Sequence, residues 1–235
     1  MESGLENRVV LVTGASGGIG SSMVRAFLAE DSKVAVHYGS QRDSAEKLAN
    51  KSEGRAKAFQ AGLTQEAEVE RLFGDIESEL GPVECVIANA GIWPAQNVPI
   101  HEMTLTQWNK TLAVDLTSVF LTMRRFFIGV RNFKLKDPSA VLIGSTAAVF
   151  GEAGHVDYAA AKAGISYGML QTLKNEISQL TRSGRVNAVC PGWVMTPMAE
   201  KFAEDRESKA RALQTIPMQK FGPVSYTHLT LPTIS

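Results

Sequence analysis

Short apolar runs alternate along the chain with longer stretches in which apolar residues recur every three or four positions. The short runs have the length of buried strands and cover residues 8–12, 33–38, 56–60, 83–88, 140–143 and 185–190. The longer stretches predict helices at 21–30, 43–51, 65–80, 104–131 and 155–181. Strand and helix therefore take turns from one end of the chain to the other.

This alternation predicts the fold class. A strand, a covering helix and a second parallel strand form a right-handed crossover, and a succession of crossovers builds a doubly wound parallel sheet. We expect a single Rossmann-like α/β domain of three layers over residues 1–223, since no linker, repeat or low-complexity tract interrupts it. Ligands of such sheets bind at the carboxyl ends of the strands, so the functional residues are expected there.

The helix predicted at 104–131 carries its apolar positions on one face. It begins with TLTQW, in which a threonine is placed to cap the helix. The apolar stripe consists of Leu112, Leu116, Val119, Phe120 and Met123. Such a stripe is typical of an amphipathic helix.

Composition narrows the function classes. The 235 residues are 44% hydrophobic and include 24 basic and 24 acidic side chains with no basic block, so nucleic acid is not an expected partner. No apolar run approaches the roughly 20 residues of a membrane span and no export signal is visible, which predicts a cytoplasmic protein without a membrane partner. Cys85 and Cys190 lie in apolar runs, and no motif has metal-ligand spacing, so neither a disulfide nor a metal site is expected.

A glycine-rich turn, TGASGGIG, follows the first strand and leads directly into a helix. Gly14, Gly18 and Gly20 allow the backbone to approach a phosphate, and the N–H groups at a helix N-terminus favour an anion. The spacing differs from the GxGxxG fingerprint, but strand, turn and helix come in the order that a phosphate site requires. A purely structural turn is the alternative.

Tyr158 and Lys162 are four residues apart in a helix-forming sequence, so their side chains share a face. A nearby cation favours a phenolate, which predicts that Lys162 lowers the Tyr158 pKa from its ordinary value of about 10 and makes the phenol a working acid and base. Ser145, at the end of the fifth strand, would then hold the oxygen of a carbonyl or an alcohol. Taken alone, the Tyr158–Lys162 pair also fits an ordinary surface turn of helix.

Further motifs complete a family pattern. An NAG turn follows the fourth strand, Ser145 precedes Tyr158 by thirteen residues, and PGWVMT follows the sixth strand. Together with TGASGGIG and the YxxxK pair, they resemble the short-chain dehydrogenase/reductase family over residues 8 to 223. The resemblance implies NAD(P)-dependent hydride transfer between a nicotinamide cofactor and a small-molecule carbonyl or secondary alcohol. The similar enzymes include 3-oxoacyl-carrier-protein reductases and small alcohol or sugar dehydrogenases.

The resemblance also implies roles for single residues. Tyr158 would be the acid and base, Lys162 would lower its pKa and hold the nicotinamide ribose, and Ser145 would orient the carbonyl. The residues implied to contact the dinucleotide, besides Tyr158 and Lys162, are Gly14, Ser16, Gly18, Ile19, Gly20, Asn89, Ala90, Gly91, Pro191, Gly192, Val194 and Thr196. The helices at 104–131 and 155–181 resemble the pair that packs into a four-helix bundle in relatives, which implies a homodimer or homotetramer.

The end of the second strand bears on the choice between NAD and NADP. NAD recognition normally uses a carboxylate at this place, whereas the chain has Tyr38 followed by GSQR. Ser40 and Arg42 suit a 2′-phosphate, so we expect cofactor contacts from Tyr38, Ser40 and Arg42 and a preference for NADP(H) over NAD(H). Against this, Gly17 stands where NADP enzymes of the family often have a basic residue, and Arg42 also fits a solvated helix start.

The side chains expected to line the substrate site all follow strand ends. They are Trp93, Ala147, His155 and Trp193, with Pro94 and the segment after Met198 beside them. This mixture of aromatic and small side chains suits an acyl chain, a sugar or a ring ketone equally. The sequence therefore predicts a carbonyl or alcohol substrate without naming it.

The chain departs from the family pattern at three places. Asp115, expected near the catalytic residues, replaces an asparagine that supports a water chain to the lysine, and a carboxylate donates no amide hydrogen to that relay. Gly62 replaces an aspartate that touches adenine. After residue 223, VSYTHLTLPTIS stands in place of the family's last helix and strand and resembles a translated sequencing adapter. We expect residues 224–235 to be a non-native tail and the sheet to lack its last strand, with a genuine extra strand as the alternative.

Two function classes are consistent with these observations. The first is an oxidoreductase, either 3-oxoacyl-carrier-protein reductase-like or a sugar or alcohol dehydrogenase that favours oxidation. The second is a non-catalytic, dinucleotide-binding regulator of the same fold, which Asp115 and Gly62 keep open. A structural protein without a cofactor site gives no reason for both the glycine turn and the YxxxK pair.

Overall fold

A computed structural model describes residues 3–52, 54–196, 199, 206–214, 216 and 218–224 of the chain. Six parallel strands form one sheet in the order β3-β2-β1-β4-β5-β6. The strands are β1 (Val9–Val12), β2 (Lys33–Tyr38), β3 (Ala56–Gln60), β4 (Cys85–Ala88), β5 (Ser139–Ile143) and β6 (Arg185–Val189). Each lies within two residues of its predicted position, and the predicted doubly wound α/β fold is confirmed.

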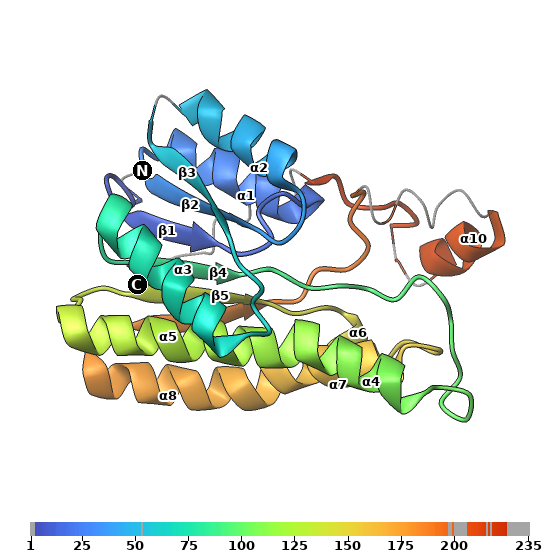
Figure 1. The fold of residues 1–235 in the computed structure, drawn as a ribbon. Coiled ribbons are helices and arrows are strands. Elements are labelled where there is room, and N and C mark those ends of the chain that lie inside the picture. The colour runs from blue at the N-terminus through green and yellow to red at the C-terminus, as the bar shows by residue number, and fades with distance from the viewer. Residues whose placement is uncertain are drawn as a thin grey trace.

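Helices cover both faces of the sheet (Figure 1). They are α1 (Gly18–Ala29), α2 (Arg42–Ala49), α3 (Glu66–Glu79), α4 (Leu105–Leu112), α5 (Ser118–Phe133), α6 (Ala147–Phe150), α7 (Val156–Ala163), α8 (Leu170–Leu180) and α10 (Arg206–Gln214). α1 and α2 lie on one face, and α3, α5 and α8 lie on the other (Figure 1). The molecule therefore has the three layers that the sequence predicts.

The central strand β1 shows why its sequence is apolar without interruption. Val9 and Leu11 pack into the core beneath α3 and α5, whereas Val10 and Val12 pack into the core beneath α1 and α2. All four side chains are buried. Because successive side chains of a strand point to opposite faces, a strand covered on both sides needs apolar residues at every position.

Both long predicted helices contain a π-helical turn. The turn η2 (Ala113–Thr117) separates α4 from α5, and η3 (Gly164–Met169) separates α7 from α8. Such turns insert an extra residue into a helix and are frequent at functional sites. The sequence pattern predicts uninterrupted helices at these places. It does not reveal the π-helical turns, because one extra residue leaves the apolar face of the helix in place.

The start of α4 is capped as predicted, but the apolar stripe of this segment is only partly buried. Thr104 accepts a hydrogen bond from the backbone N–H of Gln107 over 3.2 Å. Val119 and Met123 belong to the core, whereas Phe120 is 51% exposed. Phe120 of the predicted apolar stripe therefore lies on the surface of the single chain.

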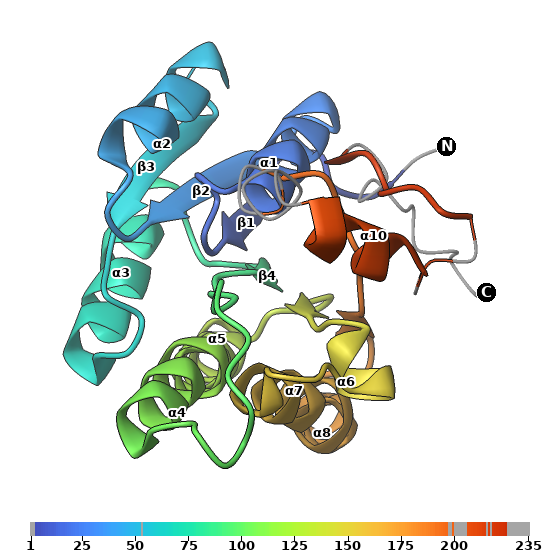
Figure 2. The ribbon, with the colours of Figure 1, turned by 90° about the vertical axis from the view of Figure 1, so that its right-hand side faces the viewer.

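The carboxyl ends of the strands face the viewer in Figure 2, with α6, α7 and α10 around them. α1 begins at Gly18, three residues earlier than predicted, and the short helix α6 was not predicted. No helix among the described residues is long and apolar enough to cross a membrane. Met198 and residues 225–235 lie outside the described residues. Of the predicted non-native tail, residues 224–235, the structure therefore describes only Val224.

Candidate active site at the carboxyl edge of the sheet

The glycine turn after β1 packs directly against the turn after β4. Gly14 has a φ of +62°, and a β-carbon on it would lie 2.9 Å from Ala90 Cα, so both its conformation and its surroundings require glycine. The Asn89 side-chain amide donates to the carbonyl oxygens of Thr13 and Gly14 over 2.9 and 3.2 Å. The structure thus brings the predicted cofactor residues of the two turns together.

The N-terminus of α1 follows this turn and suits an anion. The first turn of α1 contains no acidic side chain, so its N–H groups and the helix dipole are available to a phosphate. Gly20 lies in this first turn, where a β-carbon would be 2.5 Å from the Gly14 carbonyl oxygen and 2.8 Å from Ala15 Cα. Ser16, Gly18 and Ile19 are half-buried beside it. These residues fit the pyrophosphate of a dinucleotide.

The end of β2 contains a cavity of about 260 Å³, lined by Ser40, Gln41, Arg42, Asp43 and Ser44. Ser40 and Arg42 therefore line the same cavity. Arg42 Nε also lies 2.7 Å from Glu46 Oε1. Asp43 places a carboxylate in the same cavity.

The Tyr38 ring contributes little to the surface at the end of β2. Its side chain is only 8% exposed and packs in the core beneath α1 and α2. A cofactor contact by Tyr38 remains a prediction.

Ser145, Tyr158 and Lys162 meet at the ends of β5 and α7. The Ser145 and Tyr158 hydroxyls form a hydrogen bond. Lys162 Nζ lies 5.6 Å from the centroid of the Tyr158 ring and donates to the Ile143 carbonyl oxygen over 3.0 Å. This hydrogen bond ties the ammonium to the last residue of β5. The phenol, the hydroxyl and the cation of the predicted catalytic group are therefore in one place.

The predicted direction of the Tyr158 pKa is wrong for this structure. Burial raises the pKa of the phenol, and the hydrogen bond with Ser145 acts in the opposite direction. The charges of Asp115 and Glu152 raise it further. Burial also lowers the pKa of the Lys162 ammonium, against the charge of Asp115. Helical spacing correctly brings the Lys162 cation near the Tyr158 phenol, but it does not show how far both groups are removed from water.

Asp115 lies in the turn η2, fully buried beside Lys162. Its Oδ1 accepts a hydrogen bond from the Ile92 N–H over 2.7 Å. A β-carbon on Gly91 would be 2.9 Å from this Oδ1 and 3.3 Å from Lys162 Nζ, so only glycine fits beside the two charged groups. Burial raises the pKa of Asp115 to about 6, and the charge of Lys162 opposes this shift.

A second buried carboxylate, Asp157, lies next to Tyr158 and was missed in the sequence. Its Oδ2 accepts hydrogen bonds from Thr111 Oγ1 over 2.7 Å and from Gln107 Nε2 over 3.2 Å. These donors belong to α4, so Asp157 holds α4 against α7. An acidic residue beside a run of alanines in an otherwise apolar helix is the signal that could have revealed it.

Three of the predicted substrate residues form an aromatic wall. Trp93 stacks on His155 with ring centroids 4.8 Å apart and meets Trp193 edge-on at 5.7 Å. His155 is 1% exposed and lies 2.8 Å from the Pro94 carbonyl oxygen, so it supports Trp93 and does not itself face a ligand. The sequence also missed Glu152, whose carboxylate accepts from Trp93 Nε1 over 3.3 Å.

The fourth predicted substrate residue and the loop after β6 complete the edge. Ala147 is 7% exposed, and its backbone N–H donates to Ser145 Oγ over 3.1 Å. The Pro191 carbonyl oxygen accepts from the Thr146 N–H over 3.0 Å, which ties the loop after β6 to the end of β5. Val194 is buried, whereas Gly192 is exposed and Thr196 is half-buried.

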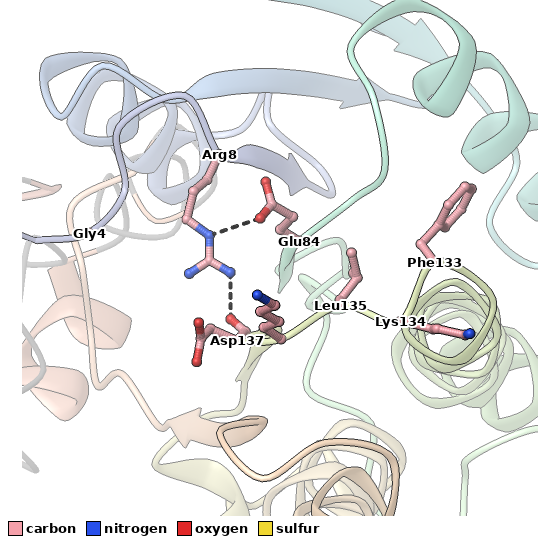
Figure 3. A pocket seen from close by; sticks show the side chains of 8 residues that line it. Gly4, Arg8, Glu84, Phe133, Lys134, Leu135 and Asp137 are labelled. Carbon is pink, nitrogen blue, oxygen red and sulfur yellow. Dashed lines mark hydrogen bonds and ion pairs between the residues drawn. The ribbon is translucent and has the colours of Figure 1, made fainter.

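A cavity of about 390 Å³ lies at the opposite, amino edge of the sheet (Figure 3). Arg8 reaches across it, with Nε 3.4 Å from Glu84 Oε1 and a hydrogen bond to the Asp137 carbonyl oxygen. Its cation is thus already matched by these acceptors. Because open parallel sheets bind ligands at their carboxyl edge, we do not assign the active site to this cavity.

Comparison with known proteins decides the family. A family model described as short chain dehydrogenase matches residues 8–207 of the chain. The chain belongs to the short-chain dehydrogenase family. Like other short-chain dehydrogenases, it is an NAD(P)-dependent oxidoreductase that acts on carbonyl and alcohol groups.

Relatives within the short-chain dehydrogenases cover most of the chain. A 3beta-hydroxysteroid dehydrogenase 1 of Eggerthella lenta is 35% identical over 94% of this chain and 84% of its own length. A 3-oxoacyl-acyl-carrier-protein reductase of Thermotoga maritima is 30% identical over 93% of this chain and 86% of its own. Nodulation protein G of Rhizobium meliloti is 33% identical over 93% and 85%. None of these relatives supports the non-catalytic regulator.

Proposed function

We propose that Ser145, Tyr158 and Lys162 carry out the proton transfer that accompanies hydride transfer between NADP(H) and a carbonyl or secondary alcohol. The observation that carries this proposal is the hydrogen bond between the Ser145 and Tyr158 hydroxyls, with Lys162 Nζ 5.6 Å from the Tyr158 ring centroid. Two adjacent hydroxyls form a site for a single carbonyl oxygen, and Tyr158 can pass its proton to that oxygen.

Tyr158 is the proton donor when a carbonyl is reduced and the proton acceptor when an alcohol is oxidised. A phenol is protonated at neutral pH, so Tyr158 can donate its proton to a carbonyl oxygen. A bound nicotinamide supplies the hydride in this direction and accepts it in the other. Lys162 Nζ lies 5.6 Å from the centroid of the Tyr158 ring, and its hydrogen bond to the Ile143 carbonyl oxygen holds the ammonium there. As negative charge develops on Tyr158 Oη, this cation stabilises it.

Preference for NADP(H) is supported by the cavity at the end of β2. Ser40 and Arg42 line it together, and a hydroxyl with a guanidinium suits a 2′-phosphate. The ion pair between Arg42 and Glu46 works against this preference, because a phosphate must compete with the Glu46 carboxylate for the same guanidinium. We propose a preference for NADP(H) that Glu46 weakens.

The aromatic wall favours substrates with an apolar body. Trp93 and Trp193 meet edge-on at the carboxyl edge, and Trp193 also lies 5.9 Å from the Phe221 ring. Aromatic surfaces of this kind bind alkyl chains and fused rings through dispersion and burial. Relatives named for 3-oxoacyl and hydroxysteroid substrates fit the same description. We therefore propose a ketone on an apolar chain or ring as the substrate class.

Exposed apolar side chains on the long helices support a homodimer or homotetramer. These side chains are Leu105, Phe120, Phe133, Tyr167 and Leu180, each at least 41% exposed. α5 and α8 lie side by side along one flank of the molecule (Figure 1). Covering such a flank with a second copy removes its apolar surface from water. Light scattering on the purified protein measures the assembly, and a monomer at all concentrations would contradict the proposal.

A turnover screen tests the proposed function. Purified protein is mixed with NADPH or NADH and with ring ketones, 3-oxoacyl thioesters or sugar ketones, and loss of absorbance by the reduced nicotinamide is followed. We expect consumption of NADPH with at least one ketone of the first two classes, and Ser145→Ala is expected to reduce this rate about a hundredfold. Dinucleotide binding without turnover of any ketone or alcohol in the panel would contradict the proposed function.

A further inference from the structure

His37 lies at the carboxyl end of β2, between the glycine turn and the end of β3. The backbone N–H of Gly14 donates to His37 Nδ1 over 3.0 Å, and His37 Nε2 lies 3.1 Å from the Ala61 carbonyl oxygen. The ring is 3% exposed. One imidazole therefore links the segments that follow β1 and β3 to the end of β2.

These two contacts fix the protonation state of the ring. A backbone N–H group can only donate, so Nδ1 must present its lone pair to Gly14. A carbonyl oxygen can only accept, so Nε2 must carry the hydrogen and donate it to Ala61. His37 is thus the neutral tautomer with the proton on Nε2. Burial agrees with this assignment, because it lowers the pKa of His37 from 6.5 to about 4.

Both backbone polar groups of Gly14 have hydrogen-bond partners. His37 accepts from its N–H, while its carbonyl oxygen accepts from Asn89 Nδ2 over 3.2 Å and from the Gly17 N–H over 3.1 Å. The Ala15 N–H donates to the His37 carbonyl oxygen over 2.9 Å. The Gly14 N–H therefore points to His37 and not to a ligand, so Gly14 contributes the shape of the turn and not its amide.

We propose that His37 is a positioning residue for the dinucleotide. Its Nδ1 fixes the Gly14 peptide, and through that peptide it fixes the turn that leads to the N-terminus of α1. This proposal rests on the proposed function, because it concerns the dinucleotide site of the same reaction. A residue that shapes only this turn alters dinucleotide affinity and leaves the chemistry at Tyr158 unchanged. The expected signature is a change in the dinucleotide Kd and KM with little change in kcat.

Two substitutions at His37 separate positioning from packing. His37→Leu fills the space without an acceptor, whereas His37→Asn keeps an acceptor atom on Cγ, where Nδ1 is attached. We expect His37→Leu to raise the NADPH Kd, measured by fluorescence titration, about tenfold, since a buried donor loses its partner. Its kcat at saturating NADPH should stay within about twofold. His37→Asn should stay within about threefold of the original Kd.

Controls make each outcome informative. His101→Leu is the same substitution at an exposed histidine and should leave the Kd unchanged. If His37→Leu does not fold, His37→Met replaces it as an acceptor-free variant of similar size. An unchanged Kd in the acceptor-free variant, or a Kd equally weakened in His37→Asn, would overturn the proposal. Failure of the unmodified protein to bind either dinucleotide would instead overturn the proposed function.

Discussion

The two sides of the carboxyl edge differ in how their buried polar groups are hydrogen-bonded. On the side of β1, β2 and β3, both ring nitrogens of His37 have partners, and the ring holds a single tautomer. On the side of β4, β5 and β6, three buried side-chain atoms have no hydrogen-bond partner among the described residues. These atoms are Asp115 Oδ2, His155 Nδ1 and Asp157 Oδ1.

The difference indicates what each side is built for. A buried polar atom that has no protein partner can accept a hydrogen bond from water or from a ligand. On the β1–β3 side the hydrogen bonds of His37 and Asn89 fix the shape of the glycine turn, which suits a preformed site for a dinucleotide pyrophosphate. The β4–β6 side contains a buried carboxyl group, Asp115, whose pKa is raised to about 6 by burial. The turn that shapes the pyrophosphate site and the groups that transfer the proton thus lie on different sides of one edge.

The largest expected effect separates the two sides at Tyr158. Tyr158→Phe removes the proton donor and leaves the glycine turn untouched, so kcat/KM should fall about 10³- to 10⁴-fold while the NADPH Kd changes less than about threefold. Steady-state kinetics and fluorescence titration measure the two quantities. Tyr167→Phe, the same change at a tyrosine that is 50% exposed, serves as the control. An NADPH Kd that rises along with the loss of kcat/KM in Tyr158→Phe would contradict this expectation.

Acid should destabilise the β1–β3 side through His37. The pKa of this ring is 6.5 when unfolded and about 4 when folded. Because the folded pKa is lowered, the stabilisation is fully present above pH 6.5 and is lost as the pH falls toward 4. Relative to His37→Asn, which does not titrate, the free energy of unfolding should decrease by about 2.5 kcal/mol between pH 7.5 and 4.5. Urea unfolding of both proteins measures this, and parallel pH profiles would contradict it.

Acid should act on the β4–β6 side in the opposite direction through Asp115. Its pKa rises from 3.8 to about 6 on folding. Because the folded pKa is raised, its stabilisation is present at low pH and is lost as the pH rises through 6. Relative to Asp115→Asn, which can still accept from the Ile92 N–H, the free energy of unfolding should increase by about 2 kcal/mol between pH 7.5 and 4.5. Urea unfolding measures this. If the free energy of unfolding depends on pH in the same way in both proteins, the Asp115 carboxylate is in contact with water in the folded protein.

The smallest expected effect concerns the cofactor preference. Glu46→Gln removes the carboxylate that pairs with Arg42 at the surface, where such pairs contribute little. The ratio of kcat/KM for NADPH to that for NADH should therefore rise only about two- to threefold. Steady-state rates with both dinucleotides measure the ratio. Glu30→Gln, an exposed control in the same layer, should leave this ratio unchanged. An unchanged ratio in Glu46→Gln would indicate that Arg42 lies outside the phosphate site.

Spacing in the sequence was sufficient for the sheet and for the meeting of Ser145, Tyr158 and Lys162. Uninterrupted apolar runs mark strands that are covered on both faces, and four residues bring two side chains to one face of a helix. The direction of the Tyr158 pKa could not be obtained in this way, because it depends on burial by segments distant in the chain. The same reason explains why the π-helical turn at Asp115 and the partners of Asp157 were missed.

A crystal structure of the protein with NADP⁺ bound tests the central claim most directly. We expect the pyrophosphate at the N-terminus of α1, beside the Gly14–Gly20 turn, and the nicotinamide ring next to the hydroxyls of Ser145 and Tyr158. A dinucleotide bound at another edge of the sheet, or a nicotinamide from which the Tyr158 phenol points away, would contradict the division of this edge into a binding side and a chemical side.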